Sequence, residues 1–191
     1  VKDNKIFLWK DDIVLWWKPK LWFISTVDWE KRSVWRCSEN WWNIDLNYLD
    51  KWSKIYLPVN FYEPRILVWD LHICEWNWES AGMWIEADWT ITIRVNVVDK
   101  IDFPVIDDKH RIFVIWWGET SEQSQKKSVE NTMIYLSRMF PFCNWPAEQI
   151  YKFISSEWNI EIWNATWTIK TCAIRFHKHR IQNKYGFLVF K

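Results

Sequence analysis

The segment from Gly82 to Trp117 constrains the fold of this chain more than any other. Residues 83–97 alternate between apolar and polar side chains, which is the period of a half-buried β-strand. The chain then turns at an Asp-Phe-Pro sequence, residues 102–104, and an apolar run resumes as far as Trp117. This pattern predicts two β-strands joined by a compact proline loop.

Similar alternation predicts β-structure through most of the chain. The expected strands span residues 5–9, 13–17, 21–27, 33–37, 54–59, 65–73, 83–97, 109–117, 158–164, 166–176 and 178–190. Between residues 124 and 155 apolar residues recur at helical spacing, which predicts one or two short inserted helices. Because there is no internal repeat or low-complexity linker, the expected fold is mainly β and forms one domain over residues 1–191.

The charge and the apolar content exclude several classes of protein. The 25 basic and 24 acidic residues are well mixed, unlike the one-sided basic face of a nucleic-acid-binding protein. No run of about 20 apolar residues is present, so we expect no membrane-spanning segment in this chain. The polar start Val1-Lys2-Asp3 is not a signal peptide, although the numbering can begin after one was removed.

Twenty tryptophans against three glycines are the unusual part of the composition. With so few glycines, the turns must be formed by Asn, Asp, Ser and Pro. Each tryptophan then serves either a core or a binding surface. The four cysteines, at 37, 74, 143 and 172, have no C-x-x-C spacing and allow three disulfide pairings. Residues 164–166 form a glycosylation sequon, which is weak support for a secreted setting.

The known catalytic motifs give no support for an enzyme. The sequence contains no nucleophile elbow and no glycine-rich phosphate loop. His177 and His179 share one face of an expected strand, and His110 would be a third metal ligand. A His-x-His pair beside basic residues is more often surface decoration than a metal site. We therefore expect no catalytic residue, no metal and no cofactor.

The spacing within the central segment carries a resemblance to a known family. Gly82 precedes Pro104 by 22 positions, Asp99 falls between them, and Phe103 forms an aromatic-proline pair with Pro104. Trp117 follows Pro104 by 13 positions. In these features the segment resembles the extracellular domain of a pentameric ligand-gated ion channel of the Cys-loop receptor superfamily.

Two flanking features bear on this resemblance. Arg180 precedes Tyr185 by five positions, as at the family's junction between the last sandwich strand and the first membrane helix. Both cysteines of the family's eponymous loop are absent, because Asn96 and His110 occupy their places. The chain is therefore similar to the branch of the family that lacks this disulfide.

The resemblance implies an immunoglobulin-like β-sandwich of about ten strands. It also implies a ligand-sensing domain that is not an enzyme. A small cationic or amine agonist would bind in an aromatic box at subunit interfaces, since aromatic ring faces attract ammonium groups. The implied box residues are Trp117, Trp76, Trp163, Trp167 and Trp35. The implied coupling loop contains Asp99, Phe103, Pro104, Asp107 and Asp108, and one of the last two carboxylates would pair with Arg180.

The same resemblance implies the partners and the location. It predicts a homo- or hetero-pentamer that is attached to the membrane by a pore domain outside this chain, with no nucleic-acid partner. The expected location is the extracellular or periplasmic face of a cell membrane. Neither the agonist nor the ion selectivity follows from the sequence.

Two other functions fit the tryptophan content. One is a carbohydrate-binding β-sandwich, in which exposed tryptophans form a platform for sugar rings. The other is a structural subunit whose aromatic residues are buried against partner chains in a larger assembly. The composition alone does not distinguish these from the receptor reading.

Overall fold

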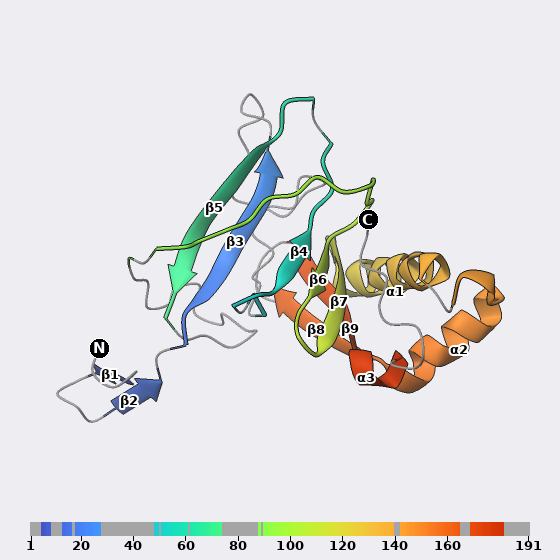
Figure 1. Ribbon diagram of the computed structural model, residues 1–191. Coiled ribbons are helices and arrows are strands. Elements are labelled where there is room, and N and C mark those ends of the chain that lie inside the picture. Colours follow the sequence, from blue (N-terminus) through green and yellow to red (C-terminus); the bar gives the residue numbers. More distant parts are fainter. Residues whose placement is uncertain are drawn as a thin grey trace.

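The computed structural model describes residues 5–8, 13–16, 18–27, 48–49, 51–60, 62–73, 88, 90–139, 142–164 and 169–181, without the side chains of residues 6, 8, 143 and 164. Within these ranges the chain is mainly β, with three antiparallel sheets and a few helices (Figure 1). The strands are β1 (Lys5–Leu8), β2 (Ile13–Trp16), β3 (Lys20–Val27), β4 (Lys54–Tyr56), β5 (Arg65–His72), β6 (Val105–Asp107), β7 (Arg111–Gly118), β8 (Asn159–Asn164) and β9 (Lys170–His177). The helices are α1 (Ser121–Arg138), the 3-10 turn η1 (Phe142–Asn144), α2 (Ala147–Glu157) and α3 (Lys178–Ile181).

The largest sheet has five strands in the order β4-β6-β7-β9-β8. Its central strand β7 is apolar at consecutive positions, and Ile112, Phe113, Val114 and Ile115 are all buried. Successive side chains of a strand point to opposite faces, so such a strand needs cover on both sides. Helix α1 covers one face (Figure 1), and the ring of Tyr48 stacks on Phe113.

Helix α1 approaches the sheet through small polar side chains. The hydroxyl of Thr120 accepts the backbone N–H of Gln123, whose side chain in turn accepts the backbone N–H of Thr120, so a capping box starts the helix. The buried Ser124 hydroxyl lies 3.0 Å from the sulfur of Cys172, and the Ser128 hydroxyl donates to the Cys172 carbonyl at 3.0 Å. These bonds fix the helix directly over β9.

At Gly118 the end of β7 approaches the start of α1 closely. A Cβ atom here would lie 2.7 Å from the backbone nitrogen of Ser124 and 2.9 Å from the Cβ of Gln123. Because backbone cannot yield without moving the helix, Gly118→Ala should reduce the free energy of unfolding by about 1–3 kcal/mol. Chemical denaturation measures this, with the exposed Glu119→Ala as the matched control. Equal midpoints for the two variants would contradict this packing.

Strands β3 and β5 form a separate antiparallel pair beside the five-stranded sheet (Figure 1). All eight residues of β3 are buried. Leu21 and Ile24 of β3 belong to the same buried cluster as the apolar residues of β7, so the pair packs against the larger sheet. The Thr26 hydroxyl donates to the carbonyl of Pro58 at 2.6 Å and ties β3 to the segment after β4.

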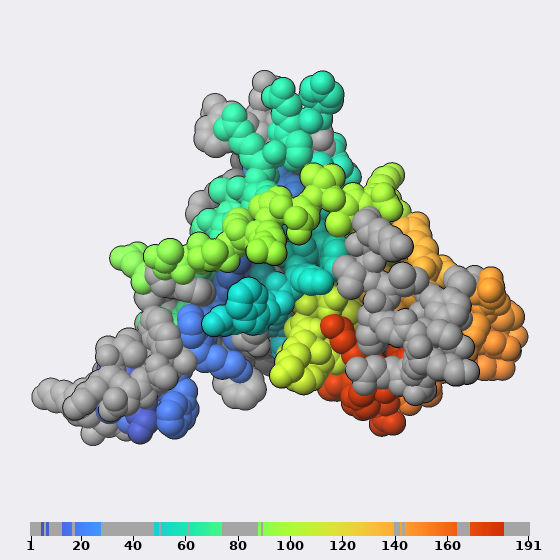
Figure 2. Space-filling model, in the orientation of Figure 1, coloured from blue at the N-terminus to red at the C-terminus, as the bar shows by residue number. Residues whose placement is uncertain are grey.

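The sequence predicted the mainly β fold and the helices of the 124–155 region, and the structure confirms both. Three details were wrong. The strand expected over 178–190 begins as helix α3. Residues 90–97, expected within a strand, join no strand among the described residues and instead cross the surface (Figure 2). Strand β6 was not anticipated. A strand requires a ladder partner, which alternation alone does not provide. The strand expected at 33–37 lies outside the described residues.

Candidate functional site

The structure separates the tryptophans that the sequence had grouped into one aromatic box. Trp117 lies half-buried on β7, with its ring stacked 6.2 Å from that of Trp116. Trp163 is buried in the core, where its ring contacts Tyr48 and Phe113 at 5.8 Å each. Trp35, Trp76 and Trp167 lie outside the described residues. The described rings therefore pack against their own chain.

Most residues of the expected coupling loop lie together, but Arg180 does not join them. Phe103 and Pro104 are buried just before β6, and Asp107 and Asp108 end and follow that strand. Asp99 is exposed. Arg180 instead lies 3.2 Å from the carboxylate of Glu157. The expected pairing with Asp107 or Asp108 was wrong because α3, and not a strand, carries Arg180.

The turn between β6 and β7 is organised by Asp108. Its Oδ1 accepts the backbone N–H groups of His110 and Arg111 at 2.7 and 2.6 Å. Its Oδ2 accepts from the Arg111 guanidinium at 2.7 Å and 2.6 Å. Burial alone would raise the pKa of Asp108, but these bonds from Arg111 and from the two backbone groups hold it below its usual range.

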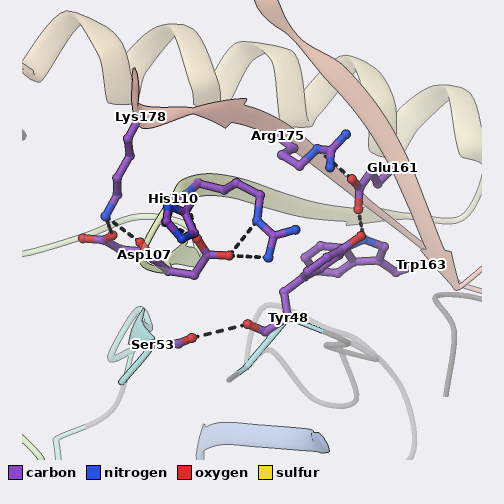
Figure 3. A network of polar contacts seen from close by, with 10 residues as sticks. Tyr48, Ser53, Asp107, His110, Glu161, Trp163, Arg175 and Lys178 are labelled. Atoms are coloured by element: carbon purple, nitrogen blue, oxygen red, sulfur yellow. Dashed lines mark hydrogen bonds and ion pairs between the residues drawn. The ribbon is translucent and has the colours of Figure 1, made fainter. Parts of the chain in front are cut away.

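Asp107 has a cationic partner just after the end of β9. The Lys178 ammonium group forms an ion pair with the Asp107 carboxylate and donates to the carbonyl of Asp108 at 2.6 Å (Figure 3). Burial, reinforced by the negative charge of Asp107, raises the pKa of Tyr56 to about 12. The ion pair thus fixes the end of β9 against the β6–β7 turn.

An aromatic cluster continues this network on the same side of the sheet (Figure 3). The Arg111 guanidinium lies over the rings of Tyr48 and Phe113, 4.7 and 5.3 Å from their centroids. Glu161 accepts the Trp163 indole N–H at 3.2 Å and pairs with Arg175 at 2.9 Å. Each acidic side chain of this network, Asp107, Asp108 and Glu161, forms an ion pair with a basic side chain of the same network. We interpret it as a structural network that holds the loop, because its groups are engaged with one another.

A second polar contact, between Asp70 and His72 of β5, lies outside this network. The Nε2 atom of His72 lies 2.8 Å from Oδ1 of Asp70, and both side chains are largely buried. The ring of Trp22, from β3, packs 5.3 Å from the His72 ring. Across the ladder, His72 is opposite Lys20, which exposes 1 % of its surface. A carboxylate and an imidazole thus meet in a buried place inside the β3–β5 pair.

The backbone at Asp70 is strained. Its φ angle is 66°, in the left-handed region that non-glycine residues avoid. The register pairs Leu21 with Leu71 and Phe23 with Trp69, so the strained residue lies within the strand and not at its end. Such a conformation costs about 1–3 kcal/mol and is found most often at functional sites. The strain, the burial and the Asp–His contact therefore coincide in one place.

This arrangement suits proton transfer. A carboxylate that accepts one imidazole N–H fixes the tautomer of the ring and stabilises the imidazolium that forms when the other nitrogen takes a proton. Histidine is the side chain that most often acts as a general base near neutral pH. We therefore take the Asp70–His72 pair as the candidate functional site.

Sequence reasoning missed this pair, although part of its signal was readable. Asp70 and His72 are two positions apart on an expected strand, so they share a face. The sequence analysis considered His110, His177 and His179 instead, as possible metal ligands. Burial, with the nearby Arg175, His179 and Arg111 charges, lowers the pKa of His177. No group of three or more His, Cys, Asp or Glu side chains that could hold a metal is found among the described residues.

The described part of the chain also contains no helix that is long and apolar enough to cross a membrane. Among the cysteines, Cys172 is a buried free thiol, whose pKa burial raises although the Ser124 contact opposes this. Cys37, Cys74 and the side chain of Cys143 lie outside the described residues, so the disulfide pairing stays a prediction.

Comparison with known proteins gives a consistent answer at the level of fold. No family model matches the chain, and no curated protein matches it in sequence. Among solved structures, an acetamidase from Bacillus halodurans superposes with a TM-score of 0.83 at 17% identity, over 94% of this chain and 61% of that one. An acetamidase from Yersinia enterocolitica gives 0.76 at 16% identity, over 96% and 55%. A recombinant predicted acetamidase/formamidase from the thermophile Thermoanaerobacter tengcongensis gives 0.77 at 17% identity, over 95% and 60%.

These likenesses correct the interpretation drawn from the central segment. The chain has the fold of acetamidase/formamidase proteins, and the resemblance to a ligand-gated channel domain was wrong. This correction also removes the predicted agonist, pentamer and pore domain. The expectation that the chain is not an enzyme was wrong as well. The carbohydrate-binding and structural-subunit alternatives gain no support either. The chain spans about three-fifths of the length of these neighbours and shares their fold over nearly all of its own.

Proposed function

We propose that this chain is the core of an amide hydrolase that releases ammonia from a small amide such as acetamide or formamide. The observation that carries the proposal is the likeness to an acetamidase, with a TM-score of 0.83 over 94% of the chain. Fold alone does not determine function, so the proposal also needs a site. The Asp70–His72 pair supplies one, since it combines burial, strain and an acid–base couple.

In this proposal His72 is the general base. The imidazole takes a proton from a water molecule as the water oxygen attacks the amide carbonyl carbon. The tetrahedral intermediate then collapses, the carbon–nitrogen bond breaks, and the departing nitrogen takes up the proton from the imidazolium. Water and the amide thus become a carboxylic acid and ammonia, and His72 returns to its starting state.

Asp70 acts through His72 as a positioning residue. Its carboxylate holds one ring nitrogen at 2.8 Å, which orients the ring and stabilises its protonated form. The strained φ angle of Asp70 is understood here as the cost of placing this carboxylate on the histidine. The immunoglobulin-like arrangement of the sheets, the single domain over residues 1–191 and the extracellular or periplasmic location stay predictions.

Ammonia release from acetamide and formamide tests the function, and Asp70→Asn tests the assigned role. Asn keeps the shape of the side chain but loses the charge, so we expect kcat to fall about 10–100-fold while KM changes little. Asp99→Asn is the matched control, because Asp99 is exposed and lies on another segment. An Asp70→Asn variant as active as the control would remove this role, and no ammonia from any small amide would count against the function itself.

A further inference from the structure

Trp52 adopts a backbone conformation that suits glycine. It lies in the turn before β4, its φ angle is 72°, and its side chain is 86% exposed. Glycine enters the left-handed region without cost, whereas a bulky residue there meets its own carbonyl oxygen. The exposed indole gains little burial that would offset this strain. The position therefore favours a residue without a side chain.

The buried Trp22 and the half-buried Trp117 also favour glycine. The indole nitrogens of Trp22 and Trp117 are buried and have no hydrogen-bond partner among the described residues. A buried indole N–H normally finds an acceptor. By contrast, glycine at these positions would bring no such donor into the interior.

The composition of the whole sequence also suggests that tryptophan replaces glycine. Glycine averages about 7% of residues, roughly 13 in a chain of this length, yet the chain has three, and it has twenty tryptophans. Tryptophan directly follows Asp or Asn at positions 29, 41, 78, 89 and 145. Asp-Gly and Asn-Gly are the dipeptides that mark turns. At these five positions of the sequence, tryptophan therefore occupies the place that glycine has in the usual turn dipeptides.

From these observations we infer that the natural protein carries glycine at most of the positions where this sequence has tryptophan. A single codon accounts for the exchange. UGA is read as tryptophan in some genetic codes and as glycine in others, whereas UGG always encodes tryptophan. The host of this gene reads UGA as glycine.

Glycine at position 22 has a consequence for the candidate site, and this step rests on the proposed function. The Trp22 indole packs against His72 and is completely buried. Without it, a space of about the size of the indole opens beside the imidazole of His72. Such a space suits a small amide. The glycine form of the chain should therefore show the higher amidase activity.

The gene and the natural protein test the inference directly. We expect UGA codons at positions 22, 52 and 117, and peptide mass spectrometry of the protein from its own host should find glycine there. UGG codons, or tryptophan in those peptides, would overturn the inference. This test does not involve catalysis, so it can succeed even if the proposed function fails.

Stability provides a second test in the purified chain. Trp52→Gly relieves the left-handed strain and should raise the melting temperature by about 2–4 °C. Tyr62→Gly is the matched control, because Tyr62 is 99% exposed but has no positive φ angle, so glycine there only adds freedom to the unfolded chain. The control should melt slightly lower than the parent. Equal decreases for both variants would contradict the assignment of position 52 to glycine.

Discussion

Asp108→Ala is expected to reduce the free energy of unfolding by about 3–5 kcal/mol, the typical cost of breaking a buried ion pair by removing one partner. The Asp108 carboxylate is nearly buried and accepts from the Arg111 guanidinium and from two backbone N–H groups. Alanine leaves all of these donors without their acceptor. The turn between β6 and β7 would lose its fixed geometry, and with it the position of Lys178.

Denaturant titrations of Asp108→Ala and of the exposed Asp99→Ala measure this effect. The control should stay within about 0.5 kcal/mol of the parent. The pKa of Asp108 is lowered in the folded chain, so its contribution is complete above the ordinary carboxyl pKa of about 3.9 and is lost as the pH falls through the lower folded value. The variant should therefore lose part of the parent's sensitivity to acid. A loss of stability no larger than that of the control would show that this network is solvated and weak.

His72→Gln is expected to lower kcat/KM for amide hydrolysis by about 100- to 10,000-fold, the usual contribution of a general base. Glutamine retains a polar side chain of similar length but cannot take up a proton. The parent should lose activity toward acid pH as His72 becomes protonated, and the variant's residual rate should lack this dependence. The pH profile thus separates a catalytic role from a purely structural one.

The matched control for this variant is His179→Gln. His179 is exposed on α3 and contacts the ring of His177, not the β3–β5 pair. It should keep the parent's rate and pH profile. If both variants lose activity together, the effect lies in the fold, and thermal melts of the two proteins would show it.

The strands were predictable where alternation or an apolar run coincides with a ladder partner. Residues 21–27, 65–73 and 109–117 were expected as strands, and they form most of β3, β5 and β7. Helix α1 was expected from its apolar spacing, but its buried face is largely small and polar, with Ser124, Ser128 and Thr132 against the sheet. Its true start could have been read from the capping box at Thr120.

The candidate site was much less predictable. A strand, a proline loop and a strand occur in many antiparallel folds, so the spacing around Pro104 indicated β-structure without identifying the family. The pairing of Asp107 with Lys178 depends on the register of β7 against β9, which brings together residues 71 positions apart. The left-handed φ angle of Asp70 depends on the surrounding packing and has no signature in the sequence.

The most direct test of this account is the rate of ammonia release from acetamide and formamide. It is measured on the chain with tryptophan at positions 22, 52 and 117 and on the chain with glycine at these positions, each with and without His72→Gln. We predict ammonia release that is higher in the glycine form and falls about 100- to 10,000-fold with His72→Gln, in a variant that thermal melts show to be folded. Hydrolysis that is undiminished by His72→Gln, or absent in both forms of the folded chain, would contradict amide hydrolysis at the Asp70–His72 pair.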